Sequence, residues 1–374
     1  MKIYTENDFI SIVRDGLVPL SREEFHKTPQ LGNLWDKLKT DDIRVQKLKT
    51  KENFYNWCYD FVHNDEPLKF YFNKRLSFVD LKPIPFVDIV DKAVKNKPNN
   101  VRLIRNINLE SILDCISSEN MSIKIAYKDA IEKGKVCRVF TVPSVFAKSI
   151  DKDYGPFAVT LKTVSGQMSI YSPSVYKTLL NELNSYISTD KQKLLIPSAS
   201  WATPILATKD STEYTNVHIV DVQKDVLDVC DNLFAYVHNQ GLFNKKPYSL
   251  KTFHTPSEKM TSVVDDDYDK IFFCPPYYDL ELYGGSDEQS TTLYKTYDEW
   301  LDGYWRQTVN ECDKVLKEGG VFSFTMGRLI RGYEMGQDMM NIAAEKFTLV
   351  DEIKILPPAE PTRGIQALNK YEIC

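Results

Sequence analysis

The strongest constraint on the fold is an alternation of helical and extended segments that begins at residue 172. Helical patterns at Ser174–Ser188, Asp225–His238, Tyr297–Leu316 and Tyr333–Glu345 are separated by short apolar runs rich in β-branched and aromatic residues. Strands that are joined through helices pair in parallel, and the helices then cover both faces of the sheet. We therefore expect an α/β domain with strands at Lys193–Ile196, Val217–Val222, Ser249–Phe253, Lys270–Phe273 and Val321–Met326.

Two further strands are predicted at Phe347–Ile355 and Ile365–Ile373, with only a loop between them, which favours an antiparallel C-terminal hairpin at one edge of the sheet. Residues 134–171 have the pattern of strands around a Ser165-Gly166 turn. Residues 1–133 have mostly helical patterns. The sequence thus predicts a mainly helical N-terminal domain over 1–133 and an α/β domain over 134–374.

Composition excludes several classes of protein. Apolar residues make up 43% of the chain and charged residues 26%, as in soluble globular proteins rather than disordered ones. No apolar run approaches the ~18 residues of a membrane helix, and residues 1–16 lack the apolar stretch of a secretory signal. The 7 cysteines are dispersed without a CxxC pair, which favours reduced thiols in a cytoplasmic setting over disulfides or a zinc site.

Charge is unevenly distributed. Residues 1–150 contain 25 Lys and Arg against 20 Asp and Glu, a net charge of +5, and the remainder contains 22 against 32, a net charge of −10. A basic front half is compatible with a polyanionic partner such as DNA. An excess of this size is also ordinary for a soluble domain, so the charge alone does not decide between the two interpretations.

The most informative segment is an apolar strand that runs directly into Cys274-Pro275-Pro276-Tyr277 and continues as Tyr278-Asp279-Leu280-Glu281. Proline removes a backbone donor and fixes φ, so the carbonyl groups of such a segment are held in a fixed direction. A Pro-Pro turn can also simply end a buried strand. The extended string, followed by Gln289-Ser290 and by Tyr297–Leu301, makes the simple turn less favoured.

This string resembles motif IV of the S-adenosylmethionine-dependent amino-methyltransferases, which methylate adenine N6 or cytosine N4 in DNA, and in particular a phage and bacterial branch with PPYYDLE. The resemblance implies a Rossmann-like methyltransferase sheet and a base flipped out of the duplex. It also implies roles for the residues of the segment. Tyr277 would stack on the base, Cys274 and the Pro275 carbonyl would face the amine with Pro276 stiffening the turn, and Tyr278, Asp279 and Glu281 would bind substrate.

The flanking segments resemble the cofactor motifs of the same family, in the same order. Ser172, before the first helix, matches the motif near the methionine part of S-adenosylmethionine. Pro197 and Trp201 match the first cofactor loop, and Asp221 ends the strand whose acid accepts hydrogen bonds from the ribose hydroxyls. Ser257 and Glu258 follow the third strand, in the loop beside the adenine ring.

Two departures from the family pattern bear on activity. The first cofactor loop has Ile196 in place of an acid, and Ser200 and Ala202 in place of two glycines that admit the cofactor or a positive φ. Cys274 stands where Asn, Asp or Ser is expected, and a thiol is a weak hydrogen-bond acceptor. Two readings remain open. One is a working DNA amino-methyltransferase. The other is a methyltransferase-like module, without catalysis, that binds DNA or protein. A third and weaker interpretation is an enzyme with the same fold that modifies a different substrate, such as a hypermodified base or a nucleotide.

The remaining candidates carry less information. No histidines are paired at metal spacing, and His254 lies near the predicted cofactor loop, where it could contact ligand. No metal site is predicted, because the Asp265-Asp266-Asp267 run is typical of a solvated loop. Arg328, Arg331 and Arg363 follow predicted strands and could equally meet phosphates or solvent. The resemblance suggests a phage or viral origin and the cytoplasm of a bacterium or a virus-infected cell, and it leaves the oligomeric state undetermined.

Overall fold

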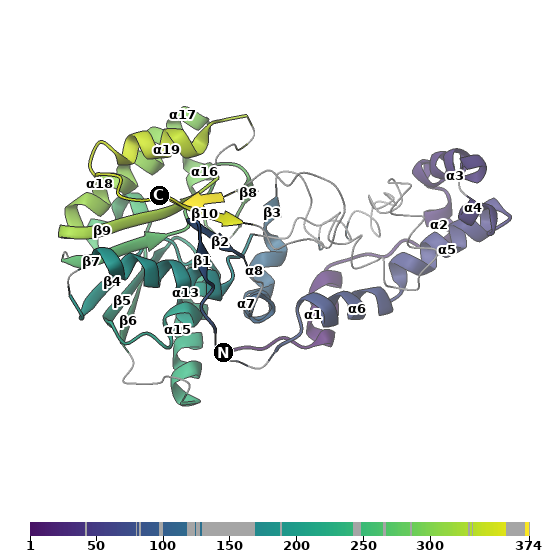
Figure 1. Cartoon of the computed structure of the whole chain (residues 1–374). Coiled ribbons are helices and arrows are strands. Elements are labelled where there is room, and N and C mark those ends of the chain that lie inside the picture. Colours follow the sequence, from purple (N-terminus) through teal and green to yellow (C-terminus); the bar gives the residue numbers. More distant parts are fainter. Residues whose placement is uncertain are drawn as a thin grey trace. The chain divides into compact units, whose positions relative to one another are not determined.

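The computed structural model describes residues 1–117, 124, 128, 169–356 and 371–373, apart from 42, 80, 82–83, 97–99, 188, 242–247, 265–266, 285, 328–329 and 331. The chain divides into two compact units (Figure 1). One contains Val79–Asn108 and Ser169–Cys374 together with Met1, and the other contains Lys2–Phe78 and Leu109–Met168. We describe each unit by itself. The predicted strands over 134–168 and the domain boundary at 133/134 lie outside the described residues.

The unit built from Lys2–Phe78 and Leu109–Met168 is mainly helical where it is described. Thr5 and Ser21 are the N-caps of the first two helices, and each forms a capping box. The cap side chain accepts from the backbone N–H three residues later, and the acidic side chain of that later residue accepts from the backbone N–H of the cap. Aromatic residues recur along α5 (Lys51–His63), whose Phe54 is fully buried with Phe25 and Leu31. The helices are α1 (Glu6–Arg14), α2 (Arg22–His26), α3 (Pro29–Asp41), α4 (Ile43–Gln46), α5 (Lys51–His63), α6 (Glu66–Arg75) and α8 (Leu109–Asp114), with the short strand β3 (Ile116–Ser117) after them.

The other unit contains a nine-stranded sheet in the order β1-β2-β10-β11-β9-β7-β4-β5-β6. The pairs β6–β5, β5–β4, β4–β7 and β7–β9 are parallel, whereas β11 is antiparallel to both β9 and β10. The strands are β1 (Ile89–Val90), β2 (Ala93–Lys95), β4 (Gln192–Ile196), β5 (Tyr214–Asp221), β6 (Ser249–His254), β7 (Tyr268–Phe273), β9 (Leu316–Met326), β10 (Ile353–Leu356) and β11 (Tyr371–Ile373). This is a Rossmann-like α/β sheet with an antiparallel C-terminal hairpin, as predicted.

Helices cover both faces of the sheet. The adjacent residues Phe272 and Phe273 of β7 point to opposite faces. Phe272 meets the ring of Tyr176 edge-on at 4.6 Å, and Phe273 stacks on Trp305 at 5.8 Å. The helical elements of this unit are α7 (Val101–Ile107), α13 (Pro173–Glu182), η1 (Leu183–Tyr186), η2 (Ser200–Ala202), α14 (Thr203–Thr208), α15 (Lys224–Asn239), η3 (Ser257–Ser262), α16 (Ser290–Leu293), α17 (Tyr297–Trp300), the π-helical turn η4 (Leu301–Trp305), α18 (Arg306–Val315) and α19 (Met335–Ala343), with the short strand β8 (Glu281–Leu282) before α16.

Three details differ from the sequence prediction. The C-terminal hairpin is not at the sheet edge, because β2 pairs in parallel with β10 and β1 then pairs with β2. The predicted helix Tyr297–Leu316 contains a π-helical turn and ends at Val315. Gly319 and Gly320, which follow the predicted helix in the sequence, lie within β9, where the register with β7 shifts. Among the described residues, no helix is long and apolar enough to cross a membrane.

Candidate functional site

The candidate site lies at the carboxyl ends of the five parallel strands β6, β5, β4, β7 and β9. Because these strands are neighbours in the sheet, the loops that follow them meet at one edge, where ligands bind in open α/β sheets. The sequence motifs fall at this edge in the order that the resemblance implied. The loops begin after Ile196, Asp221, His254, Phe273 and Met326.

The loop after β4 turns through three consecutive residues in the left-handed region, with φ of 46° at Ser200, 59° at Trp201 and 64° at Ala202. Each costs a residue with a side chain roughly 1–2 kcal/mol. Contacts from outside the loop hold it in place. The Asn108 amide donates to the Trp201 carbonyl oxygen at 3.0 Å, and Trp201 itself is buried against the Tyr283 ring. The backbone course that glycines would allow is therefore present at Ser200 and Ala202 without glycine.

Asp221 joins this loop to the end of β5. Its Oδ2 accepts from the Ala199 N–H at 2.9 Å and its Oδ1 accepts from the Gln223 N–H at 2.8 Å. Burial raises the pKa of Asp221, and the backbone donors oppose that rise. Each carboxylate oxygen has a second lone pair. The carboxylate is thus fixed in direction and still able to accept from a ligand hydroxyl.

The loop after β6 is tied to the same place. The Thr255 N–H donates to the Asp221 carbonyl oxygen at 3.1 Å. The Ser257 hydroxyl lies 3.1 Å from the Thr308 hydroxyl, and the Tyr294 hydroxyl donates to Glu258 at 3.4 Å. Burial raises the pKa of Glu258, whose side chain is largely covered. The side chains of both predicted adenine-loop residues, Ser257 and Glu258, therefore already have protein partners.

The Cys274–Tyr277 segment leaves β7 and is bonded to the end of β9. Thr325 Oγ1 donates to Cys274 Sγ at 2.8 Å. Since that hydroxyl has one hydrogen, the 3.1 Å bond between Thr325 and the Tyr277 hydroxyl must be donated by Tyr277. The Tyr171 hydroxyl, 3.3 Å away, then donates to Tyr277. The result is a directed chain that runs from Tyr171 through Tyr277 and Thr325 to the sulfur.

This chain of hydrogen bonds, together with burial, determines the chemistry of the Cys274 thiol. Burial raises the pKa of Cys274 to about 12, so the group is a thiol and not a nucleophilic thiolate. Its sulfur already accepts from Thr325, and a thiol sulfur is a weak acceptor for any further donor. Tyr277 is only 8% exposed, with its hydroxyl turned inward. Pro275 is buried and Pro276 is half-buried.

The predicted substrate residues separate into two groups. Glu281 is buried near the Cys274 segment, with Oε1 accepting from the Ser169 N–H at 2.8 Å and Oε2 from the Tyr283 hydroxyl at 2.7 Å; burial raises its pKa. Tyr278 turns away at a φ of 48° and packs edge-on against Tyr297 at 5.6 Å. Asp279, between them, is partly exposed.

Ser172 and Pro197 face the protein interior. The hydroxyl of Ser172 bonds to that of Ser174 at 2.7 Å, and both side chains are fully buried at the start of α13. Pro197 is also buried. Neither Ser172 nor Pro197 is therefore exposed at the surface of the site.

The residues that sequence reasoning missed are Asn108 and Thr325. Thr325 ends a predicted strand on the ligand edge of the sheet, and this position could have marked it as a candidate. Asn108 carries no comparable sequence signal, because its partner lies 93 residues away.

The other candidate residues from the sequence either have ordinary protein partners or lie outside the described residues. His254 bonds to the Val222 carbonyl oxygen at 3.0 Å. Asp267 forms ion pairs with Lys193 and Lys317. Within the described part of the chain, no three His, Cys, Asp or Glu side chains are grouped to hold a metal ion. Asp265, Asp266, Arg328, Arg331 and Arg363 lie outside the described residues.

No protein-family model matches the sequence, and no curated protein matches it significantly. Among solved structures, the chain is similar to the N-methyltransferase NodS from Bradyrhizobium japonicum WM9, with 13% identity, a TM-score of 0.35, and coverage of 53% of this chain and 91% of that one. It is also similar to TrmN from Thermus thermophilus, with 12% identity, a TM-score of 0.35, and coverage of 50% and 45%. SMU.1697c from Streptococcus mutans, a putative methyltransferase in complex with SAH, has 11% identity, a TM-score of 0.32, and coverage of 52% and 94%. The fold itself is defined by this chain's own strand order.

Proposed function

We propose that this protein is an S-adenosylmethionine-dependent methyltransferase that acts on an exocyclic amine of a DNA base, adenine N6 or cytosine N4. One observation carries the proposal. The left-handed turn at Ser200–Ala202, the Asp221 carboxylate and the Cys274–Tyr277 segment lie on adjacent strand ends, β4, β5 and β7, of a sheet with methyltransferase strand order. A nucleoside-bearing cofactor and a base can thus lie side by side at this edge.

The residues present fit the cofactor in two respects. Asp221 is held by two backbone N–H groups, so a carboxylate of fixed direction is available for two ribose hydroxyls. The loop at Ser200–Ala202 already has the left-handed backbone that the family's glycines serve, so its course brings backbone close to the cofactor position. S-adenosylmethionine, when bound, supplies an electrophilic methyl group on a sulfonium.

On the substrate side, the rigid Pro275-Pro276 segment would direct a backbone carbonyl oxygen at the amine. That oxygen would accept a hydrogen bond from the amine and so orient its nitrogen. Tyr277 would form one wall of the base pocket, and a flipped base would stack on it after a local opening, because Tyr277 is now covered. The thiol of Cys274 is only a weak acceptor, which favours a slow enzyme for this amine.

The first test is calorimetric titration of the full chain with S-adenosylmethionine, alongside Asp221→Ala and the control Asp225→Ala, an exposed residue at the start of α15. We expect micromolar binding, about −8 kcal/mol, in the wild type and the control and its loss in Asp221→Ala. Methyl transfer to unmodified duplex DNA follows. Absence of cofactor binding with and without duplex would reject the proposal.

A second function is a methyltransferase-like module that binds DNA or protein without catalysis. It is favoured by the chemistry of position 274, where a protonated and already bonded thiol replaces a good acceptor. This alternative predicts duplex binding that weakens steeply with salt and no dependence on cofactor. A DNA partner and a cytoplasmic setting in a bacterium or virus-infected cell belong to both versions of the proposal.

A further inference from the structure

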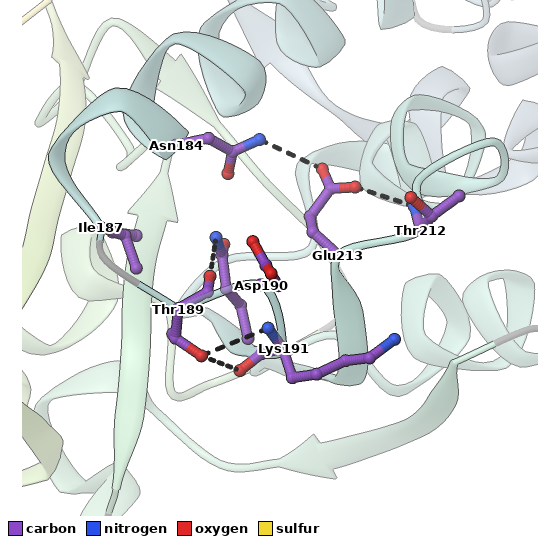
Figure 2. Close-up of a pocket in the computed structure, with 8 residues that line it drawn as sticks. Asn184, Ile187, Thr189, Asp190, Lys191, Thr212 and Glu213 are labelled. Atoms are coloured by element: carbon purple, nitrogen blue, oxygen red, sulfur yellow. Dashed lines mark hydrogen bonds between the residues drawn. The ribbon is translucent and has the colours of Figure 1, made fainter.

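A cavity lies at the amino ends of β4 and β5, at the opposite side of the sheet from the candidate site. Its volume is about 510 Å³, within the range of small-molecule sites. Gln192 is the first residue of β4, and Glu213 directly precedes β5. The lining residues are Asn184, Ile187, Thr189, Asp190, Lys191, Gln192, Thr212 and Glu213 (Figure 2).

The carboxylate of Glu213 is held in a fixed orientation. The Thr212 N–H donates to Oε2 at 2.8 Å and the Asn184 amide donates to Oε1 at 3.4 Å, and Figure 2 shows both bonds. Asp190 supplies a second carboxylate, which is exposed. Two acidic groups thus share one cavity, and one of them is oriented by the protein. Carboxylates held in this way bind ammonium and guanidinium groups through charge-assisted hydrogen bonds.

The amide of Gln192 provides an independent sign of an acceptor site. The side chain is 3% exposed, and its Nε2 donates to the Thr189 carbonyl oxygen at 3.2 Å, which fixes the orientation of the amide. Its Oε1 has no hydrogen-bond partner among the described residues. A buried carbonyl oxygen left without a donor costs free energy, and a ligand donor at the cavity wall would remove that cost.

The backbone N–H of Lys191 and the hydroxyl of Thr189 bond to each other's residues, so these two donors are not free for a ligand. The Lys191 N–H donates to Thr189 Oγ1, and the Thr189 hydroxyl donates to the Lys191 carbonyl oxygen. Behind the cavity, the nitrogen of the buried Lys270 is bonded to the Leu180 carbonyl, Asn184 Oδ1 and the Tyr214 hydroxyl. The side chain of Lys191 extends away from Asp190 and Glu213 (Figure 2). What the lining offers a ligand is acceptors.

We propose that this cavity binds a small organic cation that carries a primary ammonium or guanidinium group, held between Glu213 and Asp190. The site is separate from the proposed methyltransferase site, since it lies at the amino ends of β4 and β5 rather than their carboxyl ends. The inference therefore does not rest on the proposed function.

The test is calorimetric titration of the full chain with putrescine and with agmatine, which together present both cationic groups, and with butane-1,4-diol as the uncharged equivalent of putrescine. We expect saturable binding of at least one cation with a Kd below about 1 mM and none of the diol. Asp190→Asn and Glu213→Gln should each weaken binding about tenfold or more. Glu318→Gln, an exposed carboxylate outside the cavity, should leave it unchanged.

Three results would overturn the proposal. The first is no saturable binding of either cation up to about 10 mM. The second is an affinity in both carboxylate variants equal to that of the wild type. The third is binding of the diol as tight as that of putrescine. Because Glu213 lies near the buried Lys270, its variant could lose stability. Asp190 is exposed, so Asp190→Asn keeps the test decisive if Glu213→Gln unfolds.

Discussion

The hydroxyl of Thr325 donates to the sulfur of Cys274 over 2.8 Å and so connects the ends of β9 and β7. The same hydroxyl accepts from Tyr277, so a single side chain fixes two residues of the Cys274–Tyr277 segment. This relationship determines the hydrogen-bonding character of position 274. It also gives the candidate site a point where its rigidity and its chemistry can be altered separately.

Removal of the Thr325 hydroxyl should loosen the segment. Thr325→Val keeps the shape but leaves the buried Tyr277 hydroxyl without its acceptor, and we expect a loss of about 1–2 kcal/mol in the free energy of unfolding. Thr325→Ser keeps the hydroxyl and should lose less than half as much. Urea denaturation of the three proteins measures both values. Equal stability of Thr325→Val and wild type would mean that the bond does not hold the segment.

Replacement of Cys274 tests whether the missing acceptor limits the proposed reaction. Cys274→Asn places an amide oxygen where the thiol is only a weak acceptor, and we expect the rate constant for methylation of the amine to rise about tenfold, or ~1.4 kcal/mol in the barrier. Cys274→Ala should not raise it. Single-turnover methylation of duplex DNA at saturating cofactor measures the rate. A lower rate in Cys274→Asn than in Cys274→Ala would contradict the role assigned to this position.

The general architecture could be predicted from the sequence because it depends on local patterns. Apolar runs such as Val217–Val222 and Lys270–Phe273 are long enough to identify strands, and the order of helices and strands then determines a parallel sheet. The loops that follow those strands meet by topology alone. Asp221 and the Cys274–Tyr277 segment could therefore be brought to one edge without any knowledge of contacts.

The parts that could not be predicted depend on contacts distant in sequence or on very short elements. Strands β1 and β2 have 2 and 3 residues, too few for a period-two pattern, and β2 is added to the sheet by pairing with β10. The turn at Tyr278 separates it from Tyr277, although adjacent residues in one motif suggested a shared role. The inward direction of the Tyr277 hydroxyl depends on Thr325, 48 residues away.

A glycine at Ser200, in the left-handed turn after β4, should stabilise the folded protein. Ser200 has a φ of 46°, so Ser200→Gly relieves roughly 1–2 kcal/mol of strain and costs about 0.5–1 kcal/mol in added freedom of the unfolded chain. We expect the free energy of unfolding to rise by up to about 1 kcal/mol. Ser198→Gly, two residues earlier and outside the left-handed stretch, should lower it by about 0.5–1 kcal/mol. Thermal and urea denaturation distinguish the two. A loss in Ser200→Gly equal to that in Ser198→Gly would show that the turn is not strained at this position.

Lys270 gives the protein a specific dependence of stability on pH. Its side chain is fully buried on β7, and burial lowers the pKa of the ammonium from the ordinary 10.5 to about 7. Between these values the unfolded chain holds a proton that the folded chain has released, so acid favours unfolding and stability rises with pH. Below about pH 7 both states are protonated and this dependence disappears.

Lys270→Met removes the titration and keeps an unbranched side chain of similar length. Relative to this variant, the wild-type free energy of unfolding should rise by about 1.4 kcal/mol per pH unit between about pH 7.5 and 9.5, and the difference should be flat below about pH 6.5. Urea denaturation of both proteins at matched pH values gives the difference directly, and other titrating groups cancel between them. The control Lys224→Met replaces an exposed lysine on α15 and should leave the slope unchanged. Parallel pH profiles for wild type and Lys270→Met would mean that Lys270 remains charged in the folded protein through its bonds to the Leu180 carbonyl and Asn184.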